Sequence, residues 1–186
     1  NLFIQTNYTY QFTRGNADNP AQTFNRQGAS IDEVIRFIPM SWDQRHTFNL
    51  SAGYNTQKFG ISATGYYNSG TPYTFSPQGE SNLALLNLYP NNDYKPSNYH
   101  ADLSAYINLP KIFGFSPKID LLVYNLTDRY NEYGVSSETG RAYSAVVNET
   151  ELLSHRSNFN NYEDRYKDPS SFSAPRQIKV GLTVQF

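Results

Sequence analysis

The chain of 186 residues contains no cysteine, a single methionine and a single tryptophan. Without cysteine it cannot form disulfides, build a cysteine-based metal site or use a thiol in catalysis. Its 15 basic and 16 acidic residues nearly balance, so the chain has no strong field that would attract nucleic acid. These absences exclude whole classes of function, but they leave the cellular compartment open.

Long hydrophobic runs are also missing. No stretch of about 18 consecutive apolar residues occurs, and the mean hydropathy is -0.64, which together exclude a transmembrane helix. A transmembrane β-barrel is not excluded, because only every second residue of its strands faces lipid and a windowed average conceals the pattern. Aromatic residues make up 16% of the chain, and tyrosine favours boundaries where its ring is buried and its hydroxyl stays in water.

Alternation of apolar and polar residues predicts six β-strands. The clearest pattern is at the end of the chain, where every second residue from Ile178 to Phe186 is apolar. The segment around 116–127 is apolar on both sides, so its orientation stays open. The other four predicted strands lie at about residues 2–12, 42–54, 59–67 and 99–109.

The connections between these strands alternate in length. Residues 55–58 and 110–115 are short enough for hairpin turns. The connections 15–41, 70–97 and 128–174 are long, and structureless loops of that size are uncommon inside a compact soluble domain. Because every second connection is long, all the long loops should emerge at one end. Short turns at one rim and long loops at the other are typical of an outer-membrane barrel.

The first long loop contains apolar residues at helical spacing, namely Ile31, Val34, Ile35 and Ile38. This pattern predicts a short helix over residues 31–38. We interpret it as a loop helix that covers the mouth of the barrel rather than as a functional element.

Aromatic residues fall near both ends of the predicted strands, as they do in the girdles of membrane barrels. Trp42 and Tyr54 would share one face of a strand. At about 3.3 Å per residue and a tilt of about 45°, they would be separated by about 28 Å across the membrane. Tyr67 and Tyr99 would lie at the Trp42 end, and Phe59 and Phe186 at the Tyr54 end.

Few residues suggest chemistry. His46, His100 and His155 lack the spacing of metal ligands, and we predict no metal site, no cofactor and no enzymatic activity. Asp43 and Arg45 are interpreted as a structural ion pair. Aromatic residues of the long loops are candidate ligand-binding residues, since rings stack on sugars and other amphipathic solutes, although packing within the loops is the alternative for each. They are Tyr73, Phe75, Tyr94, Tyr143, Phe159 and Tyr162.

Four phrases resemble the C-terminal barrel portion of a TonB-dependent outer-membrane receptor, particularly those of Bacteroidetes-like bacteria. They are "SWDQRHTFNLSAGY", "YNSGTPYT", "NLTDRY" and the closing "SAPRQIKVGLTVQF". The resemblance spans the chain from about Asn1 to Phe186 and rests on the order and spacing of the phrases. It implies energised import of a scarce nutrient, such as a siderophore, a glycan or a peptide, across the bacterial outer membrane.

The resemblance also implies partners. These are outer-membrane lipid, the rest of the barrel and its plug domain, a TonB-type energising protein, the barrel assembly machinery and a surface lipoprotein. Lys179, Gly181, Val184 and Phe186 resemble the terminal signal by which outer-membrane barrels are handed to their insertion machinery. Its physical sense is that Gly181 lets the backbone approach a template closely while the ring of Phe186 settles at the interface.

The expected fold is all-β, an antiparallel transmembrane barrel segment over residues 1–186. Six strands are fewer than the eight or so that closure requires, so we expect the C-terminal part of a barrel of about 22 strands, with the plug and upstream strands elsewhere. Two alternatives stay open. The segments "LALLNLY" and "RAYSAVV" could add two strands and close a small structural outer-membrane barrel. The chain could also be a soluble extracellular β-sandwich that binds a ligand.

Overall fold

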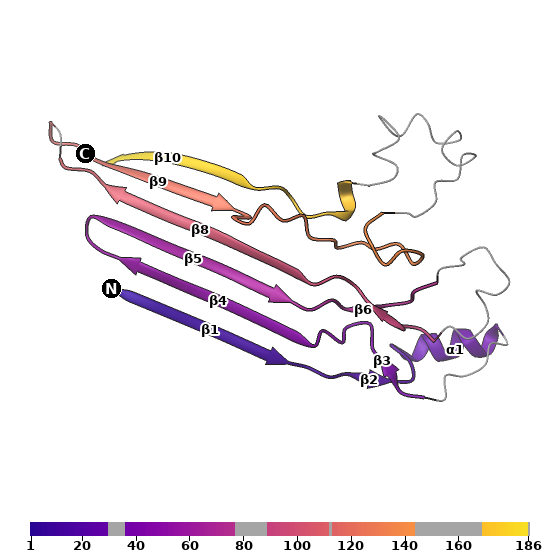
Figure 1. Cartoon of the computed structure of the whole chain (residues 1–186). Helices are drawn as coiled ribbons and strands as arrows, with labels where there is room; N and C mark the ends of the chain where they lie inside the picture. The colour runs from indigo at the N-terminus through magenta and orange to yellow at the C-terminus, as the bar shows by residue number, and fades with distance from the viewer. Residues whose placement is uncertain (30–35, 77–88, 112, 144–168, 186) are drawn as a thin grey trace, which may run out of the picture.

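The computed structural model describes the chain except for residues 30–35, 77–88, 112, 144–168 and 186. Its main element is a six-stranded antiparallel sheet in the order β1, β4, β5, β8, β9 and β10 (Figure 1). All six predicted strands are therefore confirmed, and the fold is mainly β. The strands are β1 (Leu2–Tyr10), β4 (His46–Asn55), β5 (Phe59–Asn68), β8 (Asn98–Asn108), β9 (Ser116–Tyr124) and β10 (Gln177–Gln185).

The long connections lie at one end of the sheet and the two short turns at the other, as predicted (Figure 1). Four short strands belong to the loop end. β2 (Arg14–Gly15) pairs with β3 (Ile38–Pro39), and β6 (Pro72–Tyr73) pairs with β7 (Asp93–Tyr94). A 3-10 helix, η2 (Pro169–Ser171), precedes β10. The loop end is thus built from several small elements that the sequence did not indicate.

The predicted helix at 31–38 is wrong in its described part. Ile38 lies in β3 opposite Gly15, and the following proline disfavours a helical conformation for it, while residues 31–35 lie outside the described residues. The helix of this loop is α1 (Pro20–Gly28) instead. Asn19 caps it by accepting a 2.9 Å hydrogen bond from the Gln22 amide, and Pro20 begins its first turn. Within the described ranges, no helix is long and apolar enough to cross a membrane.

The strand register gives the sheet one apolar face and one polar face. Directly opposite residues of antiparallel strands point to the same side. Leu103 lies opposite Ala63 on β5 and Val123 on β9, and Val180 lies opposite Leu121. This register resolves the open orientation of β9, whose apolar face carries Ile119, Leu121 and Val123 and whose polar face carries Leu122 and Tyr124.

The apolar face is largely uncovered. Ile4, Val180 and Leu182 are 66%, 73% and 69% exposed, and the main sheet stands as a single layer (Figure 1). Within the described part of the chain, the buried apolar side chains are only Ile38, Met40, Val123 and Ala142. A soluble protein rarely leaves so large a contiguous apolar surface open, so this face requires a partner phase or partner surface.

Aromatic side chains of the apolar face gather toward the loop end. Tyr8, Phe48, Tyr67 and Tyr99 lie opposite one another in register across four strands. At the turn end, the rings of Tyr54 and Phe59 approach to 5.9 Å between centroids. A row of four aromatic residues thus crosses four strands near the loop end, and one pair of rings lies near the turn end; the membrane girdle stays a prediction.

The prediction that Trp42 begins one of these strands is wrong. β4 starts at His46, and Trp42 lies in a turn before it and is half-exposed. The aromatic band on β4 begins at Phe48 instead. On β5, Phe59 and Tyr67 are eight residues apart, about 26 Å along the strand at about 3.3 Å per residue, whereas Trp42 and Tyr54 are twelve residues apart in the chain.

Candidate functional site at the loop end of the sheet

Asn125, directly after β9, anchors the third long loop to the sheet. Its side chain is almost fully buried and its φ of 52° is in the left-handed region, which asparagine tolerates better than most residues. The side-chain nitrogen donates to the carbonyl oxygens of Arg129 and Ala174 at 2.9 and 3.0 Å. The backbone amide donates to the Asp102 carboxylate on β8 at 2.9 Å. One residue thus joins β8, β9 and the segment that leads into β10.

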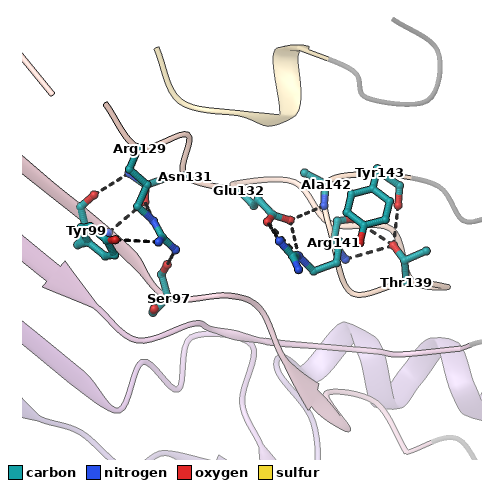
Figure 2. Close-up of polar contacts among 9 residues, drawn as sticks. All are labelled: Ser97, Tyr99, Arg129, Asn131, Glu132, Thr139, Arg141, Ala142 and Tyr143. Carbon is teal, nitrogen blue, oxygen red and sulfur yellow. Dashed lines mark hydrogen bonds and ion pairs between the residues drawn. The ribbon is translucent and has the colours of Figure 1, made fainter. Parts of the chain in front are cut away.

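Asn131 also anchors the third loop. Its side chain makes the two hydrogen bonds to a strand backbone that a residue of a neighbouring strand would make. Its fully buried side chain accepts from the Tyr99 amide at 3.1 Å and donates to the Tyr99 carbonyl at 2.8 Å (Figure 2). Arg129 donates to the same asparagine oxygen at 3.2 Å and to the Tyr99 hydroxyl at 2.9 Å, with its guanidinium 4.1 Å from the ring centroid. The third loop is therefore fixed to the start of β8.

Glu132 and Arg141 close the next part of this loop with an ion pair in which Glu132 is buried and Arg141 is half-exposed (Figure 2). Arg141 donates to both oxygens of Glu132, from Nη2 at 2.5 Å and from Nε at 2.9 and 3.1 Å, and the Ala142 amide donates at 2.6 Å. Burial by itself raises the pKa of Glu132, but these hydrogen bonds outweigh burial and hold the pKa below its ordinary value. The carboxylate is therefore ionised at neutral pH and holds residues 132–142 together.

Replacing Glu132 by glutamine should remove the acid sensitivity of this loop. Because the folded-state pKa lies below the ordinary value of 4.5, the carboxylate stabilises the loop above about pH 4.5. That contribution is lost as the pH falls through the folded-state pKa. We expect the protection factor of the Ala142 amide in hydrogen exchange to drop by the equivalent of about 1 to 2 kcal/mol between pH 7 and pH 3.

In Glu132→Gln the same protection factor should start lower and change little with pH. Glu138→Gln is the matched control, since Glu138 lies in the same loop and the described residues give its carboxylate no ion pair. An equal acid-induced loss in wild type and Glu132→Gln would show that another group holds the loop.

Asp43 and Arg45 form the predicted structural ion pair, with 3.4 Å between Nε and Oδ2, although they precede β4 rather than lying on it. Asp43 is fully buried and accepts from the Thr13 amide at 2.8 Å and from the Tyr94 hydroxyl at 2.9 Å. Burial alone raises the pKa of Asp43, yet these hydrogen bonds lower it overall. Burial and the bond to Asp43 raise the pKa of Tyr94. This cluster fastens the first long loop to β7.

The six aromatic residues predicted as candidate ligand-binding residues lie in different surroundings. Tyr94 is committed to Asp43 and Arg45, and Tyr73 donates to Asp93 at 3.3 Å while its ring stands edge-on to Phe75. These three lie on the second loop and pack there. Tyr143 lies on the third loop, near the Arg141 guanidinium. Phe159 and Tyr162 lie outside the described residues.

The second and third loops touch at Gly140. Its φ is +69°, and a Cβ added there would lie 2.3 Å from the Tyr73 hydroxyl, so only glycine fits. The Ser76 amide also donates to the Ser137 carbonyl at 2.7 Å. Tyr73, Phe75 and Tyr94 therefore contribute to loop packing, and Tyr143 lines a pocket. That pocket, of about 930 Å³, also contains Tyr130, Glu132 and Phe172.

A second pocket, of about 490 Å³, lies on the polar face of the sheet near its loop end. We call it the polar-face pocket. Its walls include Tyr66, His100, Tyr124, Tyr133, Gln177 and Lys179, and residues 173–175 adjoin them. No sequence motif marks these residues as a site, because most of the ring and charged residues lie on strands. The available signal was an aromatic ring at a position where the alternation calls for a polar residue, as at Tyr66 and Tyr124.

The residues of the suggested assembly signal are divided between the faces. Lys179 and Gly181 lie on the polar face, opposite Leu122 and Asp120, and Val184 lies on the apolar face. Phe186 is outside the described residues, so the signal stays a prediction.

Rings, amides and charged groups at this end of the sheet suit binding of a solute. Where the structure is described, no group of three or more histidine or acidic side chains is placed to hold a metal ion. A scan against protein-family models finds no matching family, and searches of curated proteins and of solved structures find no match.

Proposed function

We propose that this chain is a wall segment of an outer-membrane β-barrel that imports a scarce nutrient, driven by a TonB-type energising protein. The observation that carries the membrane part is the exposed apolar face, which continues in register across all six strands. Each Å² of apolar surface left in water costs about 25 cal/mol, so covering this face with lipid is strongly favourable.

The two open edges of the sheet support the same proposal. Among the described residues, the outer edges of β1 and β10 have no strand partner. Unpaired backbone groups cannot be left in the hydrocarbon core of a membrane, so in a bilayer both edges must pair with further strands. A barrel larger than six strands satisfies this requirement, which fits the C-terminal part of a barrel of about 22 strands.

The two alternatives have less support. A β-sandwich needs a second sheet against the apolar face, and the described part of the chain has only the two-stranded pairs β2–β3 and β6–β7, both in the loops (Figure 1). A small closed barrel needs additional strands from "LALLNLY" and "RAYSAVV". Residues 141–143 are not a strand, and the remainder of both segments, apart from Tyr89, lies outside the described residues.

Import rests on the resemblance of the four phrases to TonB-dependent receptors, together with the polar face. That face would line the lumen, and it carries a close contact between His100 Nε2 and the Asp102 carboxylate at 2.6 Å and an ion pair between Lys118 and Asp120 at 2.7 Å. In this proposal the plug, the rest of the barrel, the assembly machinery and a surface lipoprotein are the partners. The nutrient is a siderophore, a glycan or a peptide.

Single cysteines should report the orientation of the chain, because residues 1–186 contain none. Ser137 is exposed in the third long loop and Gln57 is exposed in a short turn at the opposite end. On intact cells, a membrane-impermeant maleimide should label Ser137→Cys but not Gln57→Cys. After the outer membrane is permeabilised, both should react. Labelling of Gln57→Cys alone would invert the topology, and equal labelling of both on intact cells would exclude a spanning wall.

The proposed import activity predicts a specific genetic result. Deleting the gene should slow growth when the imported nutrient is limiting, across a panel of iron–siderophore, glycan and peptide sources. Deleting the TonB-type energising protein should give at least the same defect, and the double deletion should be no slower than the energising-protein deletion alone. An additive defect would mean that the barrel works without that protein.

A further inference from the structure

Half of the residues that line the polar-face pocket lie on strands, and the pocket has the size of a small-molecule site. Tyr66 lies on β5, His100 on β8, Tyr124 on β9, and Gln177 and Lys179 on β10. Sites held by strands keep their geometry better than sites held by loops. The volume of about 490 Å³ falls within the roughly 300 to 1,000 Å³ that is usual for small-molecule sites.

Four of the ten residues that line the pocket carry a flat ring. Tyr66 and His100 stack on each other with centroids 5.7 Å apart and planes inclined by 23°, and Tyr124 and Tyr133 add two further rings. Such faces suit stacking of an aromatic ring or of the apolar C–H face of a sugar ring. Asn125 and Ser173 also line the pocket, but their side chains already hydrogen bond to Arg129. Recognition therefore falls to the rings and to the charged groups.

Lys179 brings a positive charge to this pocket, and no carboxylate of the described residues neutralises it. Its ammonium lies 5.0 Å from the Tyr124 ring centroid, and the described residues place no carboxylate within ion-pair distance of it. Lys118, on the same polar face, shows the contrast. It lies 4.9 Å from the Tyr106 ring and also 2.7 Å from the Asp120 carboxylate. His100 Nε2 likewise lies 2.6 Å from the Asp102 carboxylate.

We propose that the polar-face pocket binds a carboxylate carried on a ring, aromatic or sugar, with the carboxylate at Lys179 and the ring against Tyr124 and Tyr66. The ligand carboxylate would accept a charged hydrogen bond from the Lys179 ammonium. It would then do for Lys179 what the Asp120 carboxylate does for Lys118. The inference rests on the proposed function, because the pocket opens to the lumen only if the apolar face lies in lipid. It narrows the cargo to anionic, ring-bearing compounds, which an acidic sugar and an aromatic acid both satisfy.

The experiment measures whether the pocket binds an anion more tightly than a neutral compound with a similar ring. The full-length protein in detergent is titrated with benzoate and benzyl alcohol, and with glucuronate and glucose, so that each anion has a neutral counterpart. Wild type should bind at least one anion about tenfold more tightly than its counterpart, as expected for one charged hydrogen bond. Lys179→Gln should abolish that preference, and Lys118→Gln should retain it. The anion that binds identifies the ring as aromatic or sugar.

Removing a ring gives an independent readout. Tyr124→Leu should weaken the anion and its neutral counterpart alike, whereas Tyr106→Leu, at the other end of the polar face, should leave both unchanged. The proposal is overturned if neither anion binds, if the neutral compounds bind equally well, or if Lys118→Gln removes the preference as Lys179→Gln does. The cysteine-labelling experiment does not depend on ligand binding. A negative binding result with the expected labelling would therefore overturn the pocket proposal alone and leave the proposed membrane topology in place.

Discussion

Arginine at Leu103 should destabilise the protein in a bilayer by about 2 to 4 kcal/mol, the cost of a charge on the lipid face near the midplane. Leu103 lies in the middle of β8, four residues from Tyr99 at one aromatic band and four from Ile107 at the turn end. Arginine at Leu50, Ile61 or Val180 should cost less, in proportion to its distance from the midplane. Urea unfolding of protein folded into lipid vesicles measures these differences.

The neighbouring residue provides a matched control. Ser104 follows Leu103 on the same strand and lies opposite Ser62 on the polar face. Ser104→Arg should therefore place its charge in the aqueous lumen and cost much less, as should arginine at Ser51 or Ser62. If the arginines of the two faces cost the same, the apolar face is not in lipid, and the proposed membrane function is wrong.

The strands could be predicted from sequence because alternation is a local signal. A residue such as Leu103 or Val180 is apolar between polar neighbours, and the register then puts it beside similar residues. β9 shows the limit of this reasoning. Leu121 and Leu122 both look buried in the sequence, and only pairing with β8 and β10 decides that Leu121 belongs to the apolar face.

The loop end could not be predicted in the same way, because its contacts join residues far apart in the chain. Asn131 hydrogen bonds to Tyr99, and Asn91 reaches both Asp18 and the Pro39 carbonyl. No periodicity marks such pairs. The helix was misplaced for a different reason, since the cap formed by Asn19 and Pro20 was a local signal that the apolar spacing at 31–38 outweighed.

The candidate ligand-binding residues likewise could be identified only in part from the sequence. Tyrosine in a long loop is consistent with binding or with packing, and the partners of Tyr73 and Tyr94 decide for packing. The polar-face pocket was missed because its rings come from separate strands that only the folded sheet brings together.

Asn131 should be the most sensitive polar residue of the loop end. Asn131→Leu keeps the number and branching of the side-chain heavy atoms but leaves the Tyr99 amide and carbonyl without their partners, and it removes an acceptor of Arg129. An unpaired buried backbone group costs about 1 to 3 kcal/mol, so we expect a loss of about 2 to 5 kcal/mol in the stability of this loop. Hydrogen exchange at the Tyr99 amide measures that loss directly.

Asn92 offers the matched control, because its side chain makes the same two bonds to Phe75. It accepts from the Phe75 amide at 2.6 Å and donates to the Phe75 carbonyl at 3.0 Å, but Asn92 is exposed. In Asn92→Leu, water can replace both partners, so the loss at the Phe75 amide should be only about 0.5 to 1.5 kcal/mol. Burial is the main difference between the two sites. Equal losses at Tyr99 and Phe75 would mean that burial of Asn131 does not anchor the third loop to β8.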